Sequence, residues 1–205
     1  MKPAISTLPK GAISEVFGSS SCGKTGLLQS FLAEAAGGGE CGCVIDVLNA
    51  FDPLSAAQAG IDLRRILWVR GNGLGSQVRI DHAFKCVDMI LHGAGFGVVI
   101  LDLSDVQPRD LNRIPLSYWY RFRLAVQNTP TRLIVAADVP IVKSCARLQL
   151  EAKRESILWN GPVFGGLECA VEPRKTRVVP VVNSVINSVI NSVITRDFKT
   201  LPLAG

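Results

Sequence analysis

The sequence predicts an α/β fold with a mainly parallel central sheet. Short apolar runs alternate with helical stretches as far as Pro140, the pattern that βαβ units produce. A glycine-rich G-x-x-x-x-G-K-T segment at 18–25 lies between an apolar run and a helical pattern. A second apolar run, at 98–102, ends in an acid. The chain has 205 residues, of which 48% are hydrophobic, enough for one domain with a sizeable core.

The individual elements follow from local periodicity. Apolar runs predict strands at 13–17, 42–47, 66–69, 97–102 and 132–137. Apolar residues at helical spacing predict helices at 24–36, 53–59, 76–92 and 116–128. After Pro140 the runs are shorter and alternate with polar residues, which predicts a short antiparallel C-terminal extension with strands at 145–152, 167–172 and 176–182.

The tail differs from the rest of the chain. We expect the folded domain to cover residues 1–182 and a low-complexity tail to cover 183–205. The tail repeats the unit Val-Ile-Asn-Ser, and a period of four does not fit a half-buried strand. Its β-branched residues are also poor helix formers. The simplest interpretation is a repeat tract with no assignable function.

Residues 18–25 predict a phosphate site. A strand that feeds a glycine-rich turn into a helix directs successive backbone N–H groups and the helix dipole at one point. Gly18 and Gly23 allow the turn and the close approach of phosphate, and Lys24 would reach the β- and γ-phosphates. The Thr25 hydroxyl would hold Mg²⁺, with Asp102 at the end of its strand holding the same ion through water. The competing interpretations are a chance Ser/Gly loop and an ordinary polar strand exit.

With these motifs in place, the chain resembles the ATPase core of RecA recombinases from about residue 8 to about residue 172. The resemblance rests on Leu8–Gly11 leading into 13–18, on 44–46, and on the Ala50-Phe51-Asp52-Pro53 segment. It implies a RecA-like P-loop domain that uses ATP and Mg²⁺. Motif and resemblance together place the nucleotide against Gly18, Ser19, Ser20, Ser21, Cys22, Gly23, Lys24, Thr25, Gly26, Asp52, Asp102 and Asp138, with Thr25 and Asp102 as metal ligands.

Three departures from the RecA pattern concern chemistry. Leu48 stands where the family has the Glu that activates water, and Leu cannot accept a proton, so we assign no catalytic residue. Asp138 stands at the Gln that senses the γ-phosphate, and Ser55 at the aromatic that stacks on adenine. The family's N-terminal filament arm and C-terminal domain are not expected here. The rapid turn at 137–140 leaves little room for the second DNA-gripping loop.

A core with these losses is similar to ImuA, the RecA-related accessory family of bacterial mutasomes, and the segments 113–123 and 128–131 fit it better than RecA proper. This resemblance implies an accessory role in damage-induced translesion synthesis. The implied partners are an ImuB-type relative of Y-family polymerases, RecA itself and a DnaE-type error-prone polymerase. Two alternatives stay open: an active DNA-dependent ATPase in repair, in which another acid supplies the base, and a scaffold that uses no nucleotide.

Two basic segments bear on partners. Aromatic residues and arginines interleave at 118–123, and we favour an amphipathic helix with a buried aromatic face over a base-stacking surface. Trp119 and Arg121 remain candidate anchors for a partner protein. Residues 173–177 predict a basic turn between two strands. The net charge of +5 permits weak, non-specific DNA binding.

Composition also bounds the compartment. Cys41 and Cys43 form a C-x-C, but no second cysteine pair and no histidine near either of them completes a metal site, which argues against zinc. Free thiols fit a reducing cytosol. Residues 1–10 lack the apolar core of a signal peptide, and no apolar run approaches the length of a membrane span. We therefore expect a cytoplasmic protein with no membrane partner.

Overall fold

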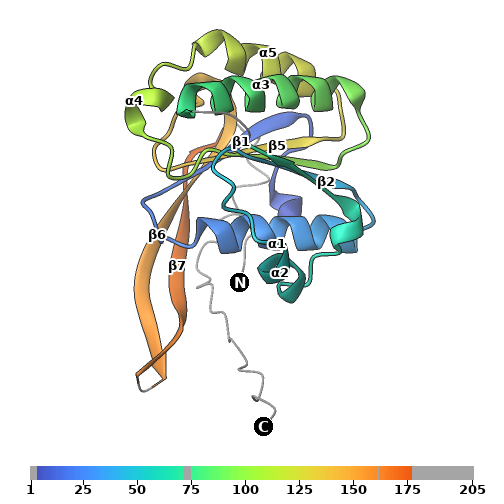
Figure 1. Cartoon of the computed structure of the whole chain (residues 1–205). Helices are drawn as coiled ribbons and strands as arrows, with labels where there is room; N and C mark the ends of the chain where they lie inside the picture. Colours follow the sequence, from blue (N-terminus) through green and yellow to red (C-terminus); the bar gives the residue numbers. More distant parts are fainter. Residues whose placement is uncertain (1–3, 72–74, 161, 177–205) are drawn as a thin grey trace.

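The predicted α/β fold with a mainly parallel sheet is confirmed, and a seven-stranded sheet lies between two layers of helices (Figure 1). The computed structural model describes residues 4–71, 75–160 and 162–176. The strand order is β3-β2-β4-β5-β1-β6-β7. Helices α3, α4 and α5 cover one face of the sheet, and α1 and α2 cover the other (Figure 1).

The first five strands form the parallel part of the sheet, together with the start of β6. Their carboxyl ends therefore meet at one edge, where the loops that carry polar side chains gather. The strands are β1 (Ala12–Phe17), β2 (Gly42–Asp46), β3 (Ile66–Arg70), β4 (Val98–Asp102) and β5 (Arg132–Ala137).

The helices also agree with the predicted ranges. The long ones are α1 (Lys24–Gly37), α3 (Ser76–Gly93) and α5 (Leu116–Val126), and α2 (Pro53–Gln58) is short. The sequence analysis missed α4 (Pro108–Leu111) and three single 3₁₀ turns, η1 (Ile5–Thr7), η2 (Leu63–Arg65) and η3 (Lys143–Cys145). Elements of three or four residues are too short to produce a periodic pattern.

The predicted antiparallel C-terminal extension is confirmed, but its strands are longer than predicted. Instead of short strands, β6 (Ala146–Asn160) and β7 (Val163–Thr176) form one long antiparallel ribbon that runs past α1 (Figure 1). The predicted basic turn is wrong, because Pro173 and Arg174 lie inside β7. Strand β7 is at the edge of the sheet, where proline is tolerated, and a register shift between Gln149 and Leu150 occurs opposite Pro173. The predicted strand at 176–182, beyond Thr176, and the 183–205 tail lie outside the described residues.

Two apolar clusters hold the layers together. One joins the sheet to α3 and α5, and the other joins the opposite face to α1. In the first cluster Phe84 packs against the rings of Trp119 and Phe122, with centroid distances of 5.1 and 5.3 Å. Trp119 is only 1% exposed, so the predicted amphipathic helix is confirmed, and Trp119 cannot serve as a surface anchor. Arg121 lies outside this core and forms an ion pair with Asp88 at 3.0 Å.

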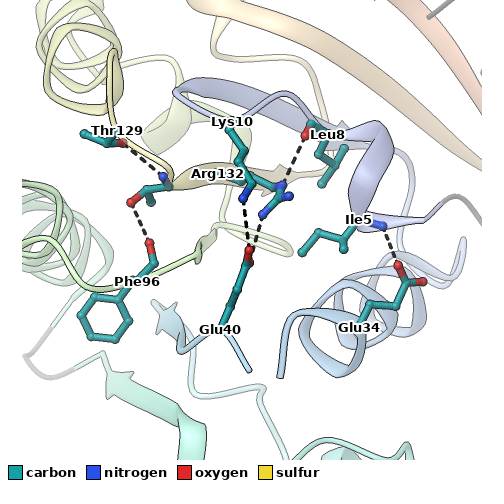
Figure 2. Close-up of polar contacts among 9 residues, drawn as sticks. Ile5, Leu8, Lys10, Glu34, Glu40, Phe96, Thr129 and Arg132 are labelled. Carbon is teal, nitrogen blue, oxygen red and sulfur yellow. Dashed lines mark hydrogen bonds and ion pairs between the residues drawn. The ribbon is translucent and has the colours of Figure 1, made fainter. Parts of the chain in front are cut away.

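At the amino edge of the sheet, an ion pair between the buried Arg132 and the half-buried Glu40 fixes the segment that precedes β1 (Figure 2). The Arg132 guanidinium lies 3.0 Å from the Glu40 carboxylate and donates a hydrogen bond of 3.3 Å to the Leu8 carbonyl. Lys10 reaches the other oxygen of Glu40 at 3.3 Å. These contacts attach the chain before β1 to β5 and to the loop after α1.

None of the helices in the described part of the chain is both long enough and apolar enough to cross a membrane.

Candidate functional site

The 18–25 segment forms a loop between β1 and α1 at the carboxyl edge of the sheet. Gly23 is the N-cap of α1, and no side chain caps the first turn. The backbone N–H groups of that turn are therefore available to an anion, which the helix dipole also attracts. Of the three serines, Ser19, Ser20 and Ser21, all are exposed, whereas Cys22 is buried.

Strands β6 and β7 pack closely against the loop, and this close contact explains why the loop has glycine at positions 18 and 23. A Cβ atom on Gly18 would lie 2.2 Å from the carbonyl oxygen of Ala152 in β6. A Cβ atom on Gly23 would lie 2.4 Å from the Cys169 sulfur in β7, and Gly23 has a φ of +89°. Both positions therefore require glycine, one for space and the other for space and conformation.

Lys24 is the buried cation of the site, with an exposure of 6%. Its ammonium donates to the carbonyl oxygens of Gly18 and Ser19 at 2.5 and 3.0 Å. It also forms an ion pair of 2.9 Å with Asp138, which directly follows β5. The structure thus brings together two predicted site residues that are 114 positions apart in the chain.

Thr25 and Asp102, the two predicted metal ligands, line one small pocket between α1, β2 and β4. Burial raises the pKa of Asp102, and the neighbouring Asp46 carboxylate raises it further. A divalent cation at this position would compensate both carboxylates, and a hydroxyl and a carboxylate are suitable oxygen ligands for Mg²⁺. The residues present therefore fit the ion that the sequence predicts, with Gly26 following Thr25 in α1.

Asp46 is a site residue that the sequence analysis missed. It ends β2 and lies beside Asp102 in the parallel register. Its carboxylate accepts hydrogen bonds from the backbone N–H groups of Ala50 and Phe51 at 3.0 and 2.8 Å, and from the Trp68 indole at 3.2 Å. These bonds hold Phe51 in the wall of the pocket. The sequence signal that could have identified Asp46 is an acid at the end of a buried strand, the same signal that identified Asp102.

Asp52 has a structural role in this conformation. It is the N-cap of α2, and its carboxylate accepts hydrogen bonds from the backbone of Leu54 and Ser55 at 3.2 and 3.0 Å. Hydrogen bonds from Ser55 and Leu54 lower the pKa of Asp52. Asp52 is not among the residues that line the pocket of Thr25 and Asp102.

Leu48, at the position where the resemblance predicts a catalytic acid, packs partly buried against the cluster beneath α3 and α5. It does not line the pocket of Thr25 and Asp102. An aliphatic side chain in the core supplies neither a base nor a hydrogen bond to an attacking water.

Glu15, in the middle of β1, is fully buried and controls the connection after β5. One carboxylate oxygen accepts from the backbone N–H groups of Ile141 and Val142 at 2.5 and 2.8 Å. The other accepts from the Gln149 amide at 2.5 Å. These bonds hold residues 141–142 in the core directly after Asp138 and keep the connection to β6 short, where RecA proteins are expected to carry a mobile loop.

Comparisons with known proteins agree with this fold and loop. The model of the RecA N-terminal domain family matches residues 2–110. The chain is 35% identical to Protein RecA of Chloroflexus aggregans over 98 residues, which are 48% of this chain and 26% of that protein. It is 32% identical to Protein RecA of Thermus aquaticus over 98 residues, 48% of this chain and 27% of that protein. The chain aligns with about a quarter of the length of these curated relatives. The chain belongs to the RecA N-terminal domain family.

Proposed function

We propose that this protein is an ATP-binding relative of RecA that assists damage-induced translesion synthesis through protein contacts and hydrolyses ATP slowly at most. The observation that carries the proposal is an intact phosphate loop in a site where Leu48 replaces the expected general base. Such a site would bind ATP but hydrolyse it slowly.

The binding part has three physical supports. The first turn of α1 is uncapped, Lys24 is held beside the loop, and Thr25 and Asp102 share a pocket. Backbone N–H groups, an ammonium and a metal site are the three features that bind a nucleotide's phosphates in P-loop proteins. ATP and Mg²⁺ are therefore the proposed ligands.

The slow rate follows from the acids around the loop. Asp138 is paired with Lys24, and Asp102 accepts a hydrogen bond from the Ser104 backbone at 2.9 Å beside the proposed metal. A leucine at the position of the general base, Leu48, should lower the rate roughly 10²–10⁴-fold. ATP would act mainly as a ligand that stabilises one conformation of the loops.

The protein contacts would use surfaces that the fold leaves open. Strand β3 is at the edge of the sheet, and Leu67 on it is 45% exposed. An open edge can accept a strand from another chain. On α5, Leu116, Tyr120 and Leu124 repeat every four residues and are exposed, so they replace Trp119 as the candidate contact of that helix. The proposed partners are an ImuB-type protein, RecA and a DnaE-type polymerase, with weak, salt-dependent DNA binding.

Calorimetry with Mg²⁺ and ATP tests the binding part. Lys24→Ala should weaken binding at least about tenfold, because charge-assisted contacts to phosphate are lost. Lys85→Ala, at an exposed position on α3, is the matched control. Equal affinity of wild type and Lys24→Ala would disprove the proposed ligand site, and would favour a scaffold that uses no nucleotide.

Pull-downs with the purified partners test the accessory role, with Leu67→Lys against the wild type. Leu67→Lys should reduce capture if β3 is the docking edge. Failure of all three partners to bind the wild type, with or without ATP, would contradict the accessory role. Rapid hydrolysis stimulated by single-stranded DNA would instead favour an active repair ATPase.

A further inference from the structure

We propose that Asp138 competes with phosphate for Lys24 and makes the site discriminate against a nucleoside triphosphate relative to the diphosphate. The inference rests on the proposed nucleotide site and adds a determinant of specificity to it.

A lysine ammonium has three N–H donors and no acceptor. In this structure Lys24 contacts three oxygens, those of the Gly18 and Ser19 carbonyls and of the Asp138 carboxylate. Its hydrogen-bonding capacity is therefore filled, and a phosphate oxygen can reach the ammonium only by displacing one of the three. The carbonyls belong to the loop itself, so the carboxylate is the partner that can leave without unfolding the loop.

Burial supports the same conclusion. The Lys24 side chain is 6% exposed, whereas the Asp138 side chain is 27% exposed. Asp138 is thus the more exposed partner of the pair, and it follows β5 at the same edge of the sheet as the phosphate loop. When a phosphate takes its place, the carboxylate remains close to the new anion.

The sheet register indicates which phosphate meets this charge. Ala137, directly before Asp138, lies beside Phe17, directly before the loop. Asp102 lies beside Ala136 on the other side of β5. The loop N–H groups hold the inner phosphates and the lysine spans the outer ones, so the terminal phosphate extends toward Asp102 and Asp138. Mg²⁺ would compensate Asp102, but displacement from Lys24 leaves Asp138 without its cation.

The third phosphate therefore adds negative charge next to a carboxylate, whereas a diphosphate places less charge there. Juxtaposed like charges in a binding site weaken binding. A preference for the triphosphate would instead require a Mg²⁺ ion between Asp138 and the terminal phosphate.

The test compares dissociation constants for Mg²⁺-ADP and a non-hydrolysable Mg²⁺-ATP analogue in the wild type, Asp138→Asn and Asp138→Ala. Both variants should bind the triphosphate at least about tenfold more tightly relative to the diphosphate than the wild type does. Asp62→Asn is the matched control, because Asp62 precedes β3 at the opposite edge of the sheet and asparagine preserves its cap on η2. This control should leave the ratio unchanged.

The outcomes separate the two proposals. An unchanged ratio, or weaker triphosphate binding in both Asp138 variants, overturns the inference while nucleotide binding itself stands. Failure of the wild type and of every variant to bind either nucleotide overturns the proposed ligand together with the inference.

Discussion

Replacing Glu15 by alanine should be among the most destabilising single changes near the site. The Glu15 carboxylate has no exposed surface and accepts hydrogen bonds from Ile141, Val142 and Gln149. Glu15→Ala leaves two backbone N–H groups of the 141–142 segment without this acceptor and opens a cavity in β1. The connection after Asp138 should then detach from the core.

The magnitude follows from opposing terms. Hydrogen bonds to a charged group contribute about 1.5–3 kcal/mol each, but burying the carboxylate offsets much of their sum. Each buried donor left unpaired costs about 1–3 kcal/mol. We expect Glu15→Ala to lower the free energy of unfolding by about 3 kcal/mol, which for a chain of this size corresponds to roughly 6–12 °C in Tm.

Glu15→Gln keeps the volume of the side chain and removes its charge, so it separates the effect of the hydrogen bonds from that of a cavity. A single glutamine oxygen can accept from both Ile141 and Val142, as one oxygen of Glu15 does, and the Gln149 amide can turn to present its carbonyl. The loss should be only about 1 kcal/mol. Urea denaturation followed by circular dichroism measures both variants, with Glu155→Gln at an exposed position on β6 as a control that stays within about 0.5 kcal/mol. The reasoning is refuted if Glu15→Ala is also within that range, or if Glu15→Gln is equally damaging.

Three further predictions concern other parts of the fold. Asp102→Asn should raise Tm at neutral pH, because burial raises the pKa of Asp102 and its ionisation therefore destabilises the folded state. In thermal scans at decreasing pH, this gain in Tm should vanish below the ordinary pKa of aspartic acid, where Asp102 is neutral in both the folded and the unfolded state. Arg132→Met should cost about 2 kcal/mol in urea denaturation, because Glu40 and the Leu8 carbonyl lose a charged hydrogen-bond donor while Lys10 still reaches Glu40; a cost below about 1 kcal/mol would contradict this. Trp119→Ala should cost about 3–5 kcal/mol, whereas Leu124→Ala on the exposed face should stay within about 0.5 kcal/mol; equal effects would contradict the assignment of Trp119 to the core.

The amino-acid sequence by itself determined the elements of the parallel sheet and the position of the phosphate loop. The signals that predicted them are local, because each depends on residues within one strand, turn or helix. They are the spacing of the apolar residues, the glycines Gly18 and Gly23, and the acid that ends β4. The spacing of the apolar residues in α5 likewise predicts its buried aromatic face.

Only the tertiary structure decided how distant segments meet. Pro173 suggests a break when considered alone, but a strand at the sheet edge accommodates it, and neither edge position nor register is a local property. The contact of Lys24 with Asp138 and the bonds of Glu15 to residues 141–149 join parts of the chain separated by more than a hundred positions. They arise because parallel strands from different parts of the sequence end at the same edge, so the charge that faces the phosphate loop depends on strand order rather than on any motif.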